Sequence, residues 1–270
     1  MKIAIDIGGT FIDLLATPAH GAPLSLKLPA QPKQLIAGLT HGLEQIFDRL
    51  GEREPIDEVF YSTTFALNSL LTHALPPIGL VVNRGFREMM ETARLPLPDD
   101  SPSPTLTPRL VALEHVREID GRLDASGSED QPLDKTQIEM LADEYLQLGI
   151  DVIAVSLLHS YLDDVHEQQV AEFLRAHGPA LTVVPSSDVL PALREYERTL
   201  ATCLNACLMP SMASHLDELN RVSNCRYLWV MKSDGALALD SHARQRPLQR
   251  LLPPRWGWLR SPMHLAKTTS

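Results

Sequence analysis

The chain contains few cysteines: Cys203, Cys207 and Cys225 are the three among its 270 residues. Three thiols cannot pair completely as disulfides, and they lack the second cysteine pair of a common zinc site. They therefore predict reduced thiols in a cytoplasmic protein. Cys203 and Cys207 are four residues apart without a nearby histidine, which favours a place in the hydrophobic core over metal binding.

Basic residues are also in short supply, since 24 Lys and Arg stand against 34 Asp and Glu, for a formal net charge of −10. Binding to nucleic acid phosphates requires a surplus of positive charge, so a nucleic-acid partner is excluded. No stretch approaches eighteen uncharged apolar residues, and Asp6 already interrupts the first apolar run. Neither a membrane span nor a signal peptide is expected. A small molecule or another protein remains as the partner.

The residues that are present predict a globular α/β fold, with 44% hydrophobic and 21% charged residues. Residues 94–109 are rich in proline and indicate a surface loop, and residues 121–132 a polar connector. The apolar patterns predict strands at 2–7, 11–16, 59–61, 78–82, 111–119, 152–158, 181–184 and 227–231. They predict helices at 32–50, 64–71, 134–148, 163–177 and from 194 towards 219.

The segment from Asp6 to Asp13 carries the clearest chemistry, because a carboxylate ends the first strand and Gly8, Gly9 and Thr10 form the following turn. Glycine allows backbone N–H groups to approach an anion, Asp6 could hold Mg²⁺ through water, and Thr10 could donate to a phosphate oxygen. The segment lacks the Lys-Ser/Thr ending of a Walker loop, and a strand rather than a helix follows the glycines. An ordinary Gly-Gly hairpin is the alternative interpretation.

Residues 6–14 resemble the first phosphate loop of the actin, hexokinase and heat-shock-protein ATPase superfamily, and most closely that of the hydantoinase/oxoprolinase A-subunit family. That family includes N-methylhydantoinase A, 5-oxoprolinase and the β subunit of acetone carboxylase. Similar segments follow in order at residues 62–68, 84–87, 157–161, 166–167, 186–198 and 205–206. The resemblance covers about residues 1–250.

This resemblance implies a ribonuclease H-like, actin-like ATPase lobe with a mixed sheet over residues 1–184, followed by the incomplete start of a second lobe over 185–252. The family continues into a Gly-Pro-Ala-Gly-Gly segment where this chain has Pro253-Pro254-Arg255-Trp256-Gly257. A one-base shift could restore that motif, so we hypothesise a frameshift near residue 253 and an irregular tail over 253–270. Such a chain would contain one of the two lobes between which these ATPases hold the nucleotide.

The resemblance also implies the activity: hydrolysis of a cyclic amide, of the hydantoin or 5-oxoproline type, driven by ATP and Mg²⁺. Asp6 would hold the magnesium ion, and Asp13 would orient water or metal. These two residues are the candidate catalytic residues. The nucleotide would be held by Gly8, Gly9, Thr10, Thr63, Thr64 and Asn68. A B-type hydantoinase subunit would be the protein partner.

Several residues have a structural alternative. Thr63, Thr64 and Asn68 suit helix capping as well as ligand binding. His159 ends a buried strand, where a packing histidine is common, and the segment Arg194–Arg198 suits a solvated helix face. Two other functions stay open for the whole chain, namely a truncated lobe without catalysis and a sugar or acid kinase of the actin-like superfamily.

Overall fold

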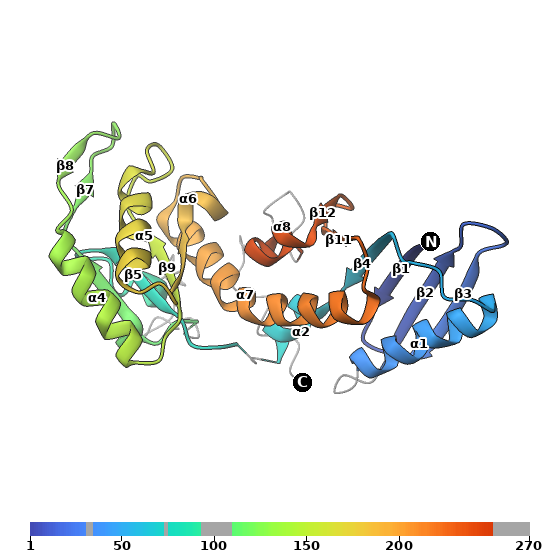
Figure 1. Ribbon diagram of the computed structural model, residues 1–270. Coiled ribbons are helices and arrows are strands. Elements are labelled where there is room, and N and C mark those ends of the chain that lie inside the picture. Colours follow the sequence, from blue (N-terminus) through green and yellow to red (C-terminus); the bar gives the residue numbers. More distant parts are fainter. Residues whose placement is uncertain (31–34, 73–74, 93–109, 251–270) are drawn as a thin grey trace, which may run out of the picture. The chain divides into compact units, whose positions relative to one another are not determined.

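The computed structural model describes residues 1–30, 35–72, 75–92 and 110–250. It divides into two compact units. Unit 1 consists of Met1–Leu75 and of the chain from Leu208 to the last described residue, and unit 2 consists of Pro76–Cys207. One long helix, α7 (Glu195–Ser223), contributes its first part to unit 2 and its second part to unit 1 (Figure 1).

Unit 1 contains a six-stranded mixed sheet (Figure 1). β1 pairs antiparallel with β2 and parallel with β4, and β4 pairs parallel with β11. The carboxyl ends of β1, β4 and β11 therefore lie at one edge of the sheet. In the order in which they lie side by side, the strands are β12 (Leu237–Leu239), β11 (Tyr227–Met231), β4 (Glu58–Thr63), β1 (Lys2–Ile7), β2 (Phe11–Thr17) and β3 (Leu24–Pro29).

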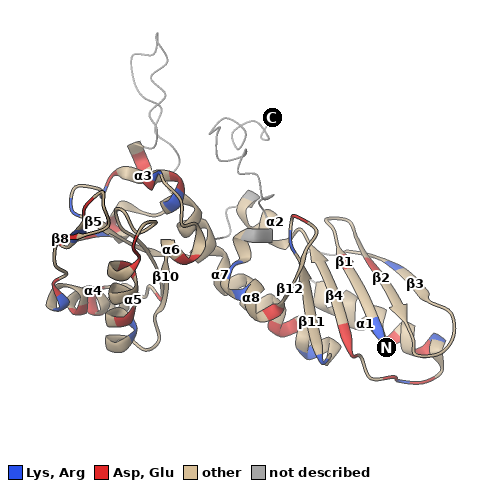
Figure 2. Cartoon of the chain, turned by 90° about the horizontal axis from the view of Figure 1, so that it is seen from above, with Lys and Arg blue, Asp and Glu red and all other residues tan. Residues whose placement is uncertain are grey.

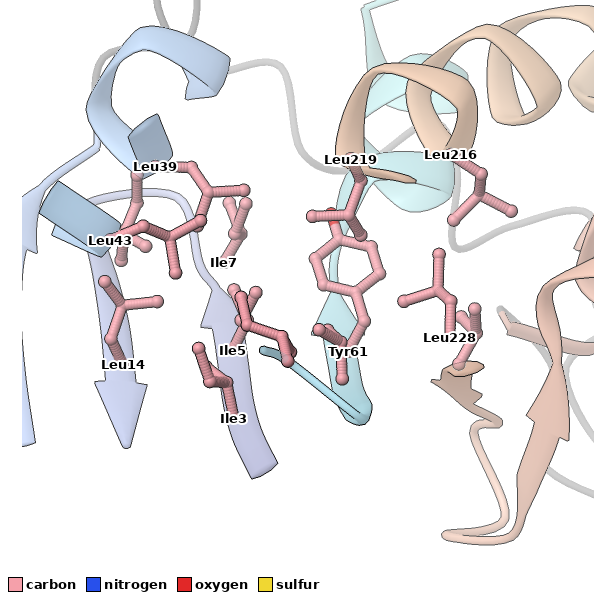
Figure 3. Packing of buried hydrophobic residues seen from close by; sticks show 14 of the residues in the cluster. Ile3, Ile5, Ile7, Leu14, Leu39, Leu43, Tyr61, Leu216, Leu219 and Leu228 are labelled. Carbon is pink, nitrogen blue, oxygen red and sulfur yellow. The ribbon is translucent and has the colours of Figure 1, made fainter. Parts of the chain in front are cut away.

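One face of this sheet is buried beneath helices. The strands alternate between buried and exposed residues, so that Ile3, Ile5 and Ile7 of β1 are all at most 3% exposed. They share a hydrophobic cluster with Leu39 of α1 and Leu219 of α7 (Figure 3). The helices of unit 1 that contribute buried residues to this cluster are α1 (Leu35–Leu50), α2 (Phe65–Leu71), the second part of α7 and α8 (Asp240–Gln245).

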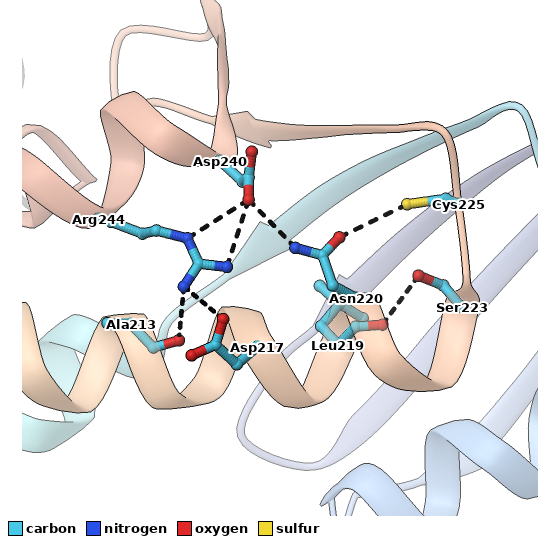
Figure 4. Close-up of polar contacts among 8 residues, drawn as sticks. All are labelled: Ala213, Asp217, Leu219, Asn220, Ser223, Cys225, Asp240 and Arg244. Atoms are coloured by element: carbon cyan, nitrogen blue, oxygen red, sulfur yellow. Dashed lines mark hydrogen bonds and ion pairs between the residues drawn. The ribbon is translucent and has the colours of Figure 1, made fainter.

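Polar contacts fix α8 against α7 within unit 1 (Figure 4). The Arg244 guanidinium donates to the Asp217 carboxylate at 2.7 Å and to the Ala213 carbonyl oxygen at 3.1 Å. The Asp240 carboxylate accepts from Asn220 at 3.1 Å and from Arg244 at 3.3 Å. The short helix α8, followed by the 3₁₀ turn η3 (Pro247–Arg250), thus lies on the same side of the sheet as α7.

Unit 2 contains a second sheet of four parallel strands, in the order β10 (Thr182–Pro185), β9 (Val152–Ser156), β5 (Gly79–Asn83) and β6 (Val116–Ile119). All residues of β5 and β9 are buried, as expected for central parallel strands. The helices α4 (Lys135–Gln147) and α5 (Val165–His177) contact each other and supply part of its core. The Asp134 carboxylate accepts from the N–H of Thr136 at 2.9 Å and caps α4.

Shorter elements complete unit 2. They are α3 (Met89–Thr92), the 3₁₀ turn η2 (Leu113–His115), the two-stranded ribbon of β7 (Arg122–Leu123) with β8 (Glu129–Gln131), and α6 (Ser186–Val189).

The expected α/β architecture with a mixed sheet is confirmed, and some elements differ from the sequence prediction. β3 and β12 were not expected: both are short edge strands, although Leu24, Leu26 and Leu28 of β3 alternate with Ser25 and Lys27. The strand expected at 111–119 is shorter, since η2 precedes β6. The connector expected at 121–132 contains the β7–β8 ribbon.

The compact units are divided differently from the family lobes expected to meet at residue 184, and that lobe boundary stays a prediction. β11, in the segment expected to begin the second lobe, pairs with β4 in the sheet of unit 1. The Pro-rich loop at 94–109 and the tail at 253–270 lie outside the described residues. Within the described ranges, no helix combines the length and apolarity that a bilayer crossing requires.

Candidate functional site

The candidate site lies at the edge of the unit 1 sheet where β1, β4 and β11 end. Ile7 of β1 is in register with Thr63 of β4, and the N–H of Thr64 donates to the Ile7 carbonyl oxygen at 3.3 Å. The turn Gly8–Thr10 and the segment Thr63–Asn68, which are far apart in the sequence, therefore start from neighbouring strand ends. The carboxyl edge of parallel strands is a common place for ligand binding in α/β proteins.

Two hydrogen bonds hold the backbone of the Gly8–Thr10 turn. The N–H of Gly8 donates to the Phe11 carbonyl oxygen at 3.0 Å, and the N–H of Ala30 donates to the Thr10 carbonyl oxygen at 2.8 Å. Gly9 and Thr10 are exposed, and a Cβ on Gly9 would meet no atom within 4 Å. Packing therefore does not require glycine at position 9, and the open space beside it suits the close approach of an anion to the backbone.

The two aspartates of the predicted site differ in their surroundings. Asp6 and Asp13 lie opposite each other in the β1–β2 register. The Asp13 carboxylate forms an ion pair with Lys27 of β3 at 2.9 Å. Asp6 is exposed and has no hydrogen bond or ion pair with any described residue. Asp6 is therefore the carboxylate that is available to the water shell of a Mg²⁺ ion, whereas the charge of Asp13 is already compensated.

Thr63, Thr64 and Asn68 have local contacts of their own. The Thr63 hydroxyl accepts from the N–H of Phe65 at 3.0 Å, and the Thr64 hydroxyl accepts from the Asn68 side-chain amide at 3.3 Å. These contacts shape the start of α2. Thr63 thus has the structural role that the sequence left open, whereas Thr64, the N-cap residue of α2, makes no side-chain bond to the helix backbone. The pairing of β4 with β1 places Thr63 beside the end of β1.

The same edge holds a third segment that sequence reasoning did not assign to the site. β11 ends at Met231, and the turn that follows contains Lys232 and Asp234, whose charged groups are 3.4 Å apart. A hydrogen bond from the N–H of Ala236 is the main cause that lowers the pKa of the Asp234 carboxyl. The pairing of β11 with β4, which brings this turn to the edge, cannot be read from the local sequence.

Beneath the edge, Tyr61 of β4 hydrogen-bonds to His215 of α7, and His215 stacks on Phe65. Both Tyr61 and His215 are buried. Burial raises the pKa of Tyr61 and lowers the pKa of His215, so both are neutral near pH 7. This pair supports the start of α2 from within the core.

Three further segments that carry the family resemblance, residues 157–161, 166–167 and 186–198, lie in unit 2 around a buried carboxylate. Glu167 of α5 accepts from the N–H of Leu157 at 2.8 Å, from the N–H of Ser187 at 2.8 Å and from the Ser160 and Ser186 hydroxyls at 2.7 and 2.6 Å. The network therefore ties the loops that follow β9 and β10 to the start of α5.

Arg198 corrects one expectation. The segment Arg194–Arg198 suggested a solvated helix face, but the Arg198 side chain is fully buried. It donates to the Ser186 hydroxyl at 3.0 Å and to the Leu157 carbonyl oxygen at 2.7 Å. Burial lowers the pKa of Arg198, and the nearby Glu167 opposes that shift. The isolated sequence gives no sign of burial, because an Arg-Glu-Tyr-Glu-Arg pattern is typical of an exposed helix.

His159 lies in the same region, in the turn after β9. Its φ of 61° is unusual for a residue with a side chain, and its Nδ1 atom is buried without a hydrogen-bond partner in the described part of the chain. A small pocket nearby is lined by Asn83, Phe86, Met89, Ser156, Leu157, Leu158 and Glu195. Asn83 and Ser156 are engaged with Gly121 and Thr199 respectively, so most of the polar groups of the pocket already serve the fold.

The cysteines carry no site chemistry. Cys203 and Cys207 are buried free thiols, as the sequence predicted, and burial raises the pKa of Cys207 to about 12. Among the described residues, no group of three or more His, Cys, Asp or Glu side chains could hold a metal ion. A Mg²⁺ ion at Asp6 would therefore rely on nucleotide phosphates and water for its other ligands.

The chain is similar to several known proteins. Residues 2–178 match the family described as "Hydantoinase/oxoprolinase N-terminal region". The caprolactamase subunit alpha of Pseudomonas jessenii is 30% identical over 93% of this chain, and the acetophenone carboxylase gamma subunit of Aromatoleum aromaticum is 34% identical over 80%. The crystal structure of the ATP-dependent caprolactamase from Pseudomonas jessenii superimposes on 88% of this chain with a TM-score of 0.75 and 31% identity.

These relatives are much longer than this chain. The chain spans 38% of the caprolactamase subunit and 32% of the acetophenone carboxylase subunit. A nucleotide-free acetone carboxylase structure, 23% identical with a TM-score of 0.73, shares the fold and is matched over 38% of its length. The matched relatives thus contain the fold of this chain together with a larger remainder.

Proposed function

Because the chain belongs to the hydantoinase/oxoprolinase family through its N-terminal region, we propose that it holds the phosphates of ATP for the hydrolysis of a cyclic amide. The observation that supports this most directly is the exposed Gly8–Thr10 turn beside the unpaired Asp6 carboxylate. The solved relative is an ATP-dependent caprolactamase, and other relatives are named 5-oxoprolinases. A lactam, hydantoin or 5-oxoproline ring is therefore the proposed substrate class.

The residues of the turn fit a nucleotide phosphate. The Gly9 and Thr10 N–H groups form no backbone hydrogen bond with any residue that the structure describes, and both residues are exposed, so these groups can donate to phosphate oxygens. The N–H of Gly8 is engaged with Phe11, and the glycine there serves the turn itself. The Thr10 hydroxyl is the additional donor, and Asp6 would hold Mg²⁺ through water.

Bound ATP supplies the phosphoryl group that makes the amide carbon of the ring electrophilic enough for attack by water. The chain's own contribution is to position that phosphate and to compensate its charge. Lys27 already neutralises Asp13, so Asp6 rather than Asp13 carries the metal role in this proposal. Lys232 follows β11, the parallel neighbour of β4, at the same edge, but its charge is paired with that of Asp234.

A partner is part of the proposal. The matched relatives are about three times as long as this chain, and several of them are named as subunits. We propose that a polypeptide carrying the remainder of the family chain completes the nucleotide site, and that a B-type subunit completes hydrolysis in the cytoplasm.

Release of ADP from MgATP tests the function. The chain should be assayed together with the remainder of the caprolactamase alpha subunit, with caprolactam, 5-oxoproline, hydantoin and glucose as candidate substrates. The proposal expects ADP release that depends on a cyclic amide, is lost in Asp6→Asn and persists in Asp48→Asn, an exposed carboxylate of α1 in the same unit. Release that depends on glucose instead, or that is unaffected by Asp6→Asn, would contradict it.

A further inference from the structure

The face of the unit 1 sheet that faces away from the helices is apolar and uncovered. Figure 2 looks onto this face, with β2 and β3 in front of α1. Six large hydrophobic side chains on it are between 41% and 46% exposed, namely Phe11, Leu15, Tyr227, Met231, Leu237 and Leu239. An ordinary sheet of an α/β protein is covered on both faces, so this exposure requires an explanation.

The apolar side chains form a continuous row across the sheet. The pairing registers place Leu239 beside Trp229, Trp229 beside Phe60, Phe60 beside Ala4, and Ala4 beside Leu15. Neighbouring strands are about 4.8 Å apart, so a row over five strands extends for about 19 Å. A surface of this length matches a folded element of another polypeptide better than a single inserted side chain.

The charged groups on this face do not prevent an apolar partner from docking. On one side of the row, Lys2 forms an ion pair with Glu58 at 2.6 Å. On the other side, Lys27 forms an ion pair with Asp13 at 2.9 Å. The row is thus flanked by two compensated ion pairs and, next to Asp13, by the Asp6 carboxylate, which has no counter-charge among the described residues. A polar rim around an apolar centre is typical of a protein interface.

Within unit 1, no described helix is left to cover this face. The helices of unit 1 that supply buried residues to the core, α1, α2, the second part of α7 and α8, all do so on the opposite face. In the caprolactamase structure, the matched part has the same fold, and the remaining 64% of the caprolactamase chain lies outside the match. The family region that this chain matches is the N-terminal one. The remainder of such a chain is therefore the polypeptide that accompanies this sheet in the relatives.

We propose that the open face of the unit 1 sheet, centred on Leu15, Ala4, Phe60, Trp229 and Leu239, is the docking surface for the polypeptide that carries the remainder of the family chain. This inference rests on the proposed function only in its choice of partner. The docking surface and the Gly8–Thr10 turn are separate sets of residues, so each can fail without the other.

The test measures association between this chain and a polypeptide comprising the part of the Pseudomonas jessenii caprolactamase alpha subunit that lies outside the match. Sedimentation velocity and calorimetry would compare the wild-type chain with the double variant Leu15→Glu/Leu239→Glu. The matched control is Met140→Glu/Leu148→Glu, which changes two residues of unit 2 that are 55% and 49% exposed. Circular dichroism would confirm that all variants remain folded.

The proposal expects association of the wild-type chain and of the control, and at least tenfold weaker association of Leu15→Glu/Leu239→Glu. Absence of association, or equal association of both variants, would overturn it. A homodimer that Leu15→Glu/Leu239→Glu dissociates, without binding of the remainder polypeptide, would assign the face to a second copy and would also overturn it. MgATP binding should also be measured for Leu15→Glu/Leu239→Glu, because both residues lie outside the phosphate turn. Failure of the docking proposal can then be distinguished from failure of the proposed function.

Discussion

Lys27 of β3 holds the carboxylate of Asp13 at 2.9 Å, while Asp6, directly opposite Asp13 on β1, has no such counter-charge among the described residues. Like charges opposite each other in an antiparallel pair repel, and Lys27 relieves that repulsion from one side. The arrangement leaves one free carboxylate beside the Gly8–Thr10 turn. Several measurable consequences derive from this and from the other contacts of the site.

Replacing Lys27 should reduce stability slightly. In Lys27→Gln the Asp6 and Asp13 carboxylates face each other without compensation, and exposed ion pairs are worth up to about 1 kcal/mol. Urea denaturation should show a loss of about 0.5 kcal/mol at low salt that shrinks at 1 M salt, where the charges are screened. Lys135→Gln, which breaks an exposed pair on α4 with no carboxylate opposite, is the control. A loss that is unchanged by salt would show that packing rather than charge is responsible.

Gly9→Ala should separate binding from folding. Because a Cβ at Gly9 meets nothing within 4 Å, the thermal midpoint should remain within about 1 °C of the wild type while affinity for MgATP falls at least fivefold. Gly121→Ala provides the contrast, since φ is 114° and its Cβ would lie 2.5 Å from the Leu133 side chain. Gly121→Ala should have a clearly lower thermal midpoint than the wild type. Unchanged MgATP affinity in Gly9→Ala would argue against the phosphate cradle.

Glu167→Gln should destabilise unit 2 strongly. The buried carboxylate accepts four hydrogen bonds and lies near the buried Arg198, so the variant leaves a buried cation without its compensating charge. The expected loss is about 3 kcal/mol. Glu172→Gln, on the exposed side of the same helix, should cost less than about 0.5 kcal/mol. Chemical denaturation measures both, and equal losses would contradict the role assigned to Glu167.

The pair of Tyr61 and His215 predicts a dependence of stability on pH. Burial lowers the pKa of His215 in the folded state, so above its unfolded pKa of about 6.5 the imidazole is neutral in both states. As the pH falls through 6.5, the unfolded state takes up a proton first, and stability decreases until the lowered folded pKa is reached.

The free energy of unfolding of the wild type should therefore decrease as the pH falls from about 7 to about 5. This part of the pH dependence should be missing in His215→Gln. His20→Gln, which changes an exposed histidine, is the control and should keep the wild-type profile. A profile that is the same in all three proteins would remove His215 as its cause.

Much of the fold could be predicted from local patterns. The alternation of Ile3, Ile5 and Ile7, the wholly apolar strand β9 and the Asp134 cap each depend on neighbouring residues in the sequence. The Gly8–Thr10 turn and the nearby Thr63 and Thr64 were predicted as candidate site segments, and the parallel pairing of β1 with β4 brings them together.

Other features depend on contacts between distant segments. The pairing of β11 with β4 spans about 170 residues of sequence and brings Lys232 to the edge of the sheet. The burial of Arg198 depends on Leu157 and Ser186, which belong to other elements. The ion pair of Asp13 with Lys27 depends on the pairing of β2 with β3. Each of these contacts joins residues of different elements, so no local pattern predicts it.

Calorimetric titration of this chain with MgATP tests the central claim most directly, with Asp6→Asn beside the wild type and Asp48→Asn as the control. The account predicts saturable binding by the wild type and by Asp48→Asn that requires Mg²⁺, and at least tenfold weaker binding by Asp6→Asn. Absence of binding by the wild-type chain, or binding that is equal in Asp6→Asn, would contradict it.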